Sequence, residues 1–400
     1  MIKYFFSITL LLLVYADCLY SKAIAIDRFS SDKLLENDTV KLQGVDTTSF
    51  KYKLDKFNNT MEKIIKYSPL PVVSYSTETD WLLGLTKINS FRIGAKSQTD
   101  TTIQPSTITA LAYFTLKNQY KFALTAKLMF GDNKYKSFTE ILFINFPEYY
   151  FGIGNETIQS DSCLVVTKNI SFTQSFSYQL AKHWYIGAKY VFKNYSKVDT
   201  VGSDNNCNLD ISDLSANEGV QSGFGVLIAH ERRDNRFNAK RGSYAYFEYL
   251  NYGEFIGSDF TYSSIILEYR KYITPLKWLT LAGQIYTEGK FGNVPIQSLA
   301  LMGGDNMMRG IYNGRFRDHT MITSQFEARI PLFWIIGGVV FTGLGEVAPK
   351  YGDYNLQGIK WTYGAGLRLM VDQSTRVNMR FDMGFFDGNS LFFFTFSEAF

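Results

Sequence analysis

Three arginines lie within one glycine-rich stretch, residues 303–318, which reads Gly-Gly-Asp-Asn-Met-Met-Arg-Gly-Ile-Tyr-Asn-Gly-Arg-Phe-Arg-Asp. A guanidinium group forms paired hydrogen bonds with carboxylates. Glycine lets the backbone adopt positive φ or come close to another segment. These residue types therefore favour ion pairing that holds a loop against a neighbouring structure. The alternative is an ordinary surface loop.

Side chains that carry out catalysis or bind metals are few. The three histidines are His183, His230 and His319. A hydrolase on the outside of a membrane barrel would need a serine beside one of these histidines, and no sequence motif indicates such a pair. Cys163 and Cys207 have no histidine at ligand spacing, so the expectation is no catalysis, no metal site and no cofactor. These two cysteines form one disulfide or remain two free thiols.

The overall charge does not select a partner, since 41 basic residues face 37 acidic ones and the formal charge is +4. No basic cluster is interleaved with aromatic residues, so binding to nucleic acid is not expected. The 34 phenylalanines and 27 tyrosines are a heavy aromatic content. At 46% hydrophobic and 20% charged, the chain resembles a soluble protein, as membrane β-barrels commonly do.

The N-terminus has the pattern of an export signal. Lys3 precedes an apolar run over residues 4–15, and small-residue cleavage patterns follow near residues 21–25. Residues 1–25 are therefore predicted to be a signal peptide. Cys18 follows Asp17, which is a poor fit to a lipoprotein box. No later stretch reaches the ~18 apolar residues of a membrane helix, which leaves a periplasmic, secreted or outer-membrane protein.

From residue 70 onward, apolar and polar residues alternate. Over residues 376–385 the odd positions are Val, Met, Phe, Met and Phe, whereas the even ones are Arg, Asn, Arg, Asp and Gly. The segments are about 10 to 15 residues long and carry aromatics near their ends, which favours membrane strands over the ~5–6 residues of soluble sheets. Polar residues such as Glu327 and Asp382 fall on the parity expected to face a wet interior.

Sixteen strands are predicted, joined alternately by short turns and by longer polar loops from the middle of the chain on, as in an outer-membrane barrel. Their ranges are 71–77, 80–97, 104–116, 120–131, 135–146, 164–180, 184–197, 218–232, 241–252, 258–274, 276–290, 319–333, 335–347, 358–371, 374–385 and 389–400. The fold prediction is an all-β, transmembrane, antiparallel up-and-down barrel over residues 70–400. Residues 26–69 form a short periplasmic segment. Cys163 and Cys207 fall in consecutive external loops.

The two ends of the sheet are predicted to meet at a seam. Pro71 cannot donate to a strand ladder, so it either shortens pairing there or only marks the start of a strand. On the last strand, Phe396 and Phe400 share one face with other phenylalanines. Such a strand is either a sorting signal for outer-membrane barrels, a lipid-facing strand, or both.

Five motifs, in order, resemble the BamA/TamA surface-antigen family of outer-membrane barrels. They are the opening hairpin from Pro71 to Gly84, the turn from Arg232 to Gly242, the stretch from Met308 to Tyr312 after Gly303-Gly304, the stretch from Glu327 to Leu332, and the stretch from Phe341 to Gly345. The resemblance covers about residues 70–400. It implies that residues 291–318, the sixth external loop, fold back into the barrel lumen.

The resemblance also implies which residues hold that loop. Arg309, Gly310 and Tyr312 form its signature, and an inward carboxylate should bind Arg309. The family has an aspartate where this chain has Gly343, so Glu327 becomes the expected partner and Asp382 a second candidate.

Assembly factors of this family carry periplasmic POTRA modules, and residues 26–69 are too short for one. The chain therefore resembles the POTRA-less members, in the bacterial outer membrane. The implied function is insertion or translocation of unfolded outer-membrane or secreted proteins, in contact with membrane lipid and with an accessory periplasmic partner. The alternative is a plugged or open pore, or a structural barrel without insertase activity.

Overall fold

The computed structural model describes residues 68–76, 80–94, 104–200, 217–372 and 375–400, together with Lys56 and Thr60. The chain divides into two compact units, Met1–Thr60 and Met61–Phe400. In the first unit, Thr60 Oγ1 donates a hydrogen bond to the main-chain oxygen of Lys56 at 2.9 Å. The predicted signal peptide and most of segment 26–69 lie outside the described residues. Within the described ranges, no helix is long and apolar enough to cross a membrane.

The second unit is an antiparallel sheet of sixteen strands in which each strand pairs with its neighbour along the chain, apart from a small inserted hairpin. In order, the sheet strands are β1 (Leu70–Ser76), β2 (Asp80–Phe91), β3 (Ser106–Thr115), β4 (Tyr120–Phe130), β5 (Tyr135–Tyr150), β6 (Cys163–Ala181), β7 (Trp184–Thr200), β8 (Gly219–Glu231), β9 (Gly242–Tyr252), β10 (Tyr262–Leu276), β11 (Leu279–Gly292), β14 (Thr320–Phe333), β15 (Ile336–Ala348), β16 (Lys360–Asp372), β17 (Val377–Phe386) and β18 (Asn389–Phe396). The predicted number of strands and the predicted barrel class are confirmed.

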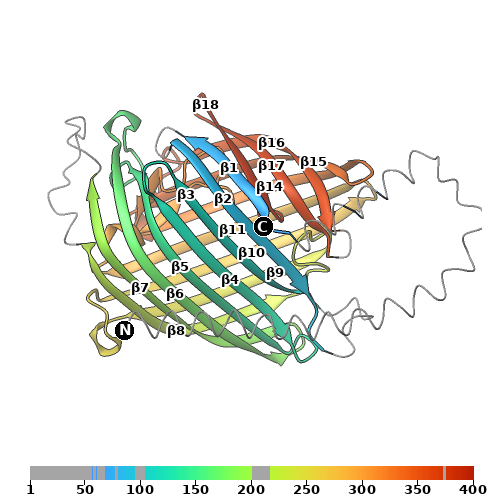
Figure 1. Cartoon of the computed structure of the whole chain (residues 1–400), viewed down its shortest axis with the longest axis horizontal. Helices are drawn as coiled ribbons and strands as arrows, with labels where there is room; N and C mark the ends of the chain where they lie inside the picture. The colour runs from blue at the N-terminus through green and yellow to red at the C-terminus, as the bar shows by residue number, and fades with distance from the viewer. Residues whose placement is uncertain are drawn as a thin grey trace, which may run out of the picture. The chain divides into compact units, whose positions relative to one another are not determined.

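Figure 1 shows the strands tilted about a common axis, with β1 and β18 on the same side of the sheet. Side chains alternate between the two faces, as the pleat requires. On β14, Thr323, Gln325 and Glu327 are buried on the inner face, whereas Ile322 and Phe326 are exposed on the outer face. The apolar face therefore meets lipid and the polar face lines the lumen.

Short turns join the strands at one end of the barrel, for example at residues 182–183, 277–278 and 334–335. Longer connections, among them residues 151–162 and 293–319, lie at the other end, although residues 232–241 form a ten-residue turn at the first end. Short turns are periplasmic and long loops external in outer-membrane barrels. This sets the orientation used below.

The two ends of the sheet differ from the predicted closed ring of hydrogen bonds. The strand order runs from β1 to β18, and within the described residues no ladder joins these two. They are also short for this barrel, with 7 and 8 residues. Their outer backbone groups are therefore left without strand partners, which is costly at membrane depth.

The long connection over residues 293–319, called the lumen loop below, contains a two-stranded hairpin of β12 (Ala300–Met302) and β13 (Phe316–Asp318). Apolar residues of this loop, including Met308 and Ile311, pack with inward residues of the wall such as Tyr286 and Val347. The loop thus lies inside the barrel, as the sixth external loop was predicted to do.

Candidate functional site

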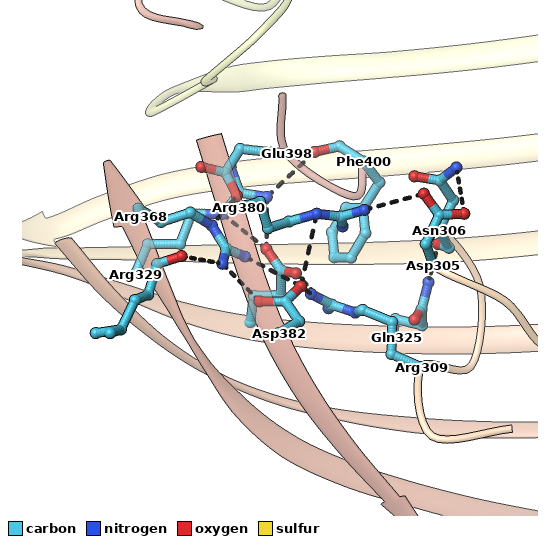
Figure 2. Close-up of polar contacts among 12 residues, drawn as sticks. Asp305, Asn306, Arg309, Gln325, Arg329, Arg368, Arg380, Asp382, Glu398 and Phe400 are labelled. Atoms are coloured by element: carbon cyan, nitrogen blue, oxygen red, sulfur yellow. Dashed lines mark hydrogen bonds and ion pairs between the residues drawn. The ribbon is translucent and has the colours of Figure 1, made fainter. Parts of the chain in front are cut away.

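Six buried charged side chains form a closed ring of alternating sign in the lumen (Figure 2). The members of this charge ring, in order around it, are Arg309, Glu327, Arg329, Glu398, Arg368 and Asp382. It joins the lumen loop to β14, β16, β17 and the segment after β18. Within the ring three arginines alternate with three carboxylates, and a fourth buried arginine, Arg380, lies 3.6 Å from Asp382 outside the ring.

Arg309 is the member that the lumen loop contributes. Its Nη1 donates to Asp382 at 2.7 Å and its Nη2 donates to Glu327, and all three side chains are fully buried. The guanidinium also lies 3.7 Å from the centre of the Phe341 ring, a favourable cation–π distance. The structure therefore brings together both carboxylates that the sequence proposed as partners of Arg309.

The other side of the ring holds the segment that follows β18. Glu398 accepts a hydrogen bond from Arg368 Nε at 2.7 Å and one from Asn378 Nδ2 at 2.6 Å. Arg368 Nη1 also donates to Asp382 at 2.5 Å, while Arg329 Nε donates to Glu327 at 2.7 Å. Removing one partner from a buried pair costs about 3–5 kcal/mol, because the remaining charge stays desolvated.

The position of Gly343 explains how the loop is held without the expected aspartate. A Cβ at Gly343 would lie 2.9 Å from Thr362 Oγ1 and 3.0 Å from Met308 Sδ. Met308 thus fills the space in front of the strand, and its main-chain nitrogen donates to Gln325 Oε1 at 3.0 Å. At Gly343 the wall therefore leaves space for the Met308 side chain and does not supply a carboxylate for Arg309.

Gly310 lets the loop backbone touch the wall beside Arg309. Its φ is +111°, and an added Cβ would lie 2.8 Å from the main-chain nitrogen of Phe385 on β17. The wall is small at the same place, since a Cβ at Gly384 would lie 2.5 Å from the nitrogen of Gly310. Two glycines therefore face each other where two backbones meet.

Substituting alanine for Gly310 is expected to undock the loop, because both the backbone conformation and the contact with Phe385 exclude a side chain. We expect faster proteolysis within residues 303–318 of the folded barrel. The matched control is Gly352→Ala, since a Cβ at Gly352 meets nothing within 4 Å. Equal cleavage in the two variants would contradict this account of the contact.

Tyr312 lies at the opposite side of the lumen from the charge ring. Its hydroxyl accepts a hydrogen bond from the main-chain nitrogen of Tyr149 at 3.4 Å, and its ring packs edge-on against Tyr149 and Phe151. Nearby, Arg315 Nη2 donates to the main-chain oxygen of Thr157 at 2.6 Å. The signature residues Arg309 and Tyr312 therefore attach one loop to two separate parts of the wall.

The predicted last strand, 389–400, is wrong at its end, because β18 stops at Phe396. Ser397 has a φ of +69°, and the chain then turns into the lumen. Phe400 is buried in a cluster with Ala239, Tyr272 and Ala282 rather than facing lipid. Its main-chain oxygen accepts a hydrogen bond from Arg329 at 3.1 Å. The apolar alternation breaks at Glu398, which pairs with Arg368 and Arg329 in the lumen instead of continuing the lipid-facing row.

A periplasmic turn, residues 232–241, reaches the same segment from the other side. The main-chain nitrogen of Glu398 donates to the oxygen of Phe237 at 3.3 Å, and Asn235 Nδ2 donates to the oxygen of Thr375 at 3.0 Å. Burial lowers the pKa of Arg236 in this turn, and the nearby Glu231 carboxylate opposes that shift. The turn therefore packs inward and helps to enclose segment 397–400.

The remaining predicted residues are not brought into the charge ring. Pro71 lies on edge strand β1 and Phe396 is the last residue of edge strand β18. Cys163 is disulfide-bonded, while Cys207 lies outside the described residues. Metal binding finds no support in the described ranges, where no group of three or more His, Cys, Asp or Glu side chains could hold an ion.

Sequence reasoning missed Arg329, Arg368 and Glu398. Both arginines had a usable signal, since each lies on the inward parity of its strand and needs a carboxylate there. Glu398 had a different signal, because it is a carboxylate on the parity of Phe394 and Phe396 and so breaks the lipid-facing alternation.

These features define an outer-membrane β-barrel whose lumen is occupied by its own loop. A family model described as the Omp85 superfamily domain matches residues 115–400, which is more than half of the chain. The chain therefore belongs to the Omp85 superfamily, and it is a protein of the bacterial outer membrane. The family predicted from the motifs is confirmed.

Two solved CdiB structures of low sequence identity share the fold. CdiB from Escherichia coli matches at 8% identity with a TM-score of 0.51, over 90% of this chain and 70% of that one. CdiB from Acinetobacter baumannii matches at 11% identity with a TM-score of 0.50, over 81% of this chain and 58% of that one. BamA from Haemophilus ducreyi lacking POTRA domains 1-3 gives 10% identity, a TM-score of 0.49, and coverage of 86% and 77%. No curated protein matches the chain.

Proposed function

We propose that this barrel inserts or translocates unfolded outer-membrane or secreted proteins. The observation that carries the proposal is the sheet order, which ends at two short strands, β1 and β18, without a ladder between them in the described residues. An extended segment of a client can add to such an edge through main-chain hydrogen bonds. Pro71 and Phe396 lie on these two strands. An accessory periplasmic partner that delivers the client is part of the proposal.

The position of segment 397–400 supports an edge that accepts other strands. Because Glu398 is bound inside the lumen, the chain leaves the sheet after Phe396 and does not extend β18 along β1. The described residues therefore contain no β1–β18 ladder, whereas β5 and β6, for comparison, pair from Tyr135 to Tyr150. A client strand can therefore pair with this edge without first displacing a β1–β18 ladder.

The test is depletion of the protein followed by an inventory of outer-membrane and secreted proteins. We expect several other barrels, or one class of secreted protein, to disappear from the outer membrane or the medium. Restoring the wild-type chain should restore them. An unchanged inventory together with loss of uptake of one solute would overturn the proposal in favour of a pore.

A second measurement separates the alternative of an open pore. The lumen loop and segment 397–400 both occupy the interior through buried contacts. In planar bilayers we therefore expect the wild-type barrel to give small, irregular conductance, and Arg309→Ala to give larger steps. A large steady conductance in the wild type would identify an open channel instead.

A further inference from the structure

The outer surface of β7–β11, on strands away from the β1–β18 join, carries an apolar groove of about 430 Å³. Residues from five adjacent strands line it, including Trp184, His230, Ala245, Tyr269 and Ile285. These five are direct neighbours across the sheet, one on each of β7, β8, β9, β10 and β11. The groove therefore runs across the strands along one row of outward side chains, with the small side chain of Ala245 at its middle.

Because strands in a barrel are staggered, this row changes depth in the membrane. At one end, Trp184 is the first residue of β7, next to the short turn 182–183 at the periplasmic rim. At the other end, Ile285 lies in the middle of β11. The groove thus begins at the periplasmic headgroup level and rises toward the centre of the bilayer.

Cationic side chains lie at the periplasmic border of the groove. Arg232 and Lys271 are outward and exposed, and they are both neighbours of Ser243, one on each side of it. Two strand spacings place their backbones about 10 Å apart, which long side chains can close around one phosphate. Neither side chain has a carboxylate partner among the described residues. His230 packs against Trp184 with ring centres 4.6 Å apart and ring planes tilted by 39°, and it adds a ring nitrogen beside the two cations.

We propose that this groove binds one glycerophospholipid of the periplasmic leaflet. Its phosphate lies between Arg232 and Lys271, and one acyl chain follows the row past Ala245 toward Ile285. Two observations on the same surface support a phospholipid over a soluble anion or an uncharged lipid. The cations fit the phosphate charge, and the apolar groove that starts beside them fits a chain entering from the headgroup level.

The test is native mass spectrometry of the full-length barrel from maltoside micelles that contain phosphatidylglycerol. We expect the wild type to retain one phosphatidylglycerol through detergent washing. The double variant R232S/K271S should bind it about 25-fold more weakly, since each surface cation contributes about fivefold. Ala245→Leu, which fills the middle of the groove, should also release the lipid.

Matched controls make the outcome specific to this site. Lys168→Ser removes an outward cation near the external end of β6, and Ala328→Leu enlarges an outward alanine on β14; both variants should retain the lipid. Diacylglycerol, which lacks the phosphate, should not replace phosphatidylglycerol, and inorganic phosphate should not displace it. The proposal is overturned if the wild type retains no lipid, if the charge variant binds as the wild type does, or if diacylglycerol binds equally well. A co-purifying polypeptide in place of lipid would also overturn it.

Discussion

Replacing Arg309 with alanine is expected to release the lumen loop, so that protease cuts within residues 303–318 of the folded barrel. Arg309 is the only ring member on the loop, and it binds Asp382 and Glu327 at once. Its removal leaves two carboxylates buried with one arginine fewer. Loop docking should weaken by about 3 kcal/mol. The barrel itself should persist, because Arg329 and Arg368 still pair with the two carboxylates.

Two further variants sharpen this experiment. Arg309→Lys keeps the charge but presents a compact ammonium that cannot divide its donors between the two carboxylates in the same geometry, so intermediate cleavage is expected. Arg241→Ala removes an exposed arginine of a periplasmic turn and should leave the cleavage unchanged. Folded protein can be recognised by its heat-dependent migration in detergent gels. Cleavage of Arg309→Ala at the wild-type rate, in folded barrel, would exclude the proposed role of Arg309.

Neutralising Glu398 is expected to free segment 397–400 from the lumen. Glu398→Gln loses the ion pairs with Arg368 and Arg329 and leaves the ring with one uncompensated positive charge. Hydrogen bonds to charged groups contribute about 1.5–3 kcal/mol, so exposure of the segment should increase about tenfold or more. Labelling of a cysteine introduced by Ala399→Cys measures it, because Ala399 is buried in the wild type.

The labelling is best read at residue 399 by peptide mass spectrometry, so that the native cysteines do not contribute. Glu254→Gln, at an exposed position in the connection between β9 and β10, is the matched control and should leave the rate unchanged. If Glu398→Gln labels no faster than this control, the ion pairs of Glu398 do not hold the segment. If Glu398→Gln does label faster, client insertion measured in the same variant shows whether release of segment 397–400 affects the join between β1 and β18.

Much of this architecture follows from side-chain alternation. The period of two predicts that Glu327 and Asp382 face inward, and both side chains are buried on that face. The alternation of short turns and longer loops along the sequence identifies residues 291–318 as the sixth external loop. These inferences succeed because each strand has one apolar and one polar face, and a shift by one residue would expose every apolar side chain to the lumen.

The end of the chain could not be predicted in this way. Phe392, Phe394, Phe396 and Phe400 share one parity in sequence, which only Glu398 interrupts, but β18 ends at Phe396 and Phe400 lies inside. The turn at Ser397 has no glycine or proline to mark it. The chain turns inward because Glu398 pairs with Arg329 on β14 and Arg368 on β16, two strands that precede β18 in the sequence. A tertiary ion pair therefore outweighs the local preference.

The closed form of the charge ring has a consequence for communication across the barrel. Arg309 enters it from an external loop, whereas Glu398 enters it from the periplasmic end, and both connect through the same four wall residues. Because both dockings use these four residues, we expect them to be coupled, and thermodynamic linkage makes such a coupling reciprocal. Removal of Glu398 from the ring therefore makes docking of the lumen loop less favourable. Release of the lumen loop makes binding of Glu398 less favourable by the same free energy.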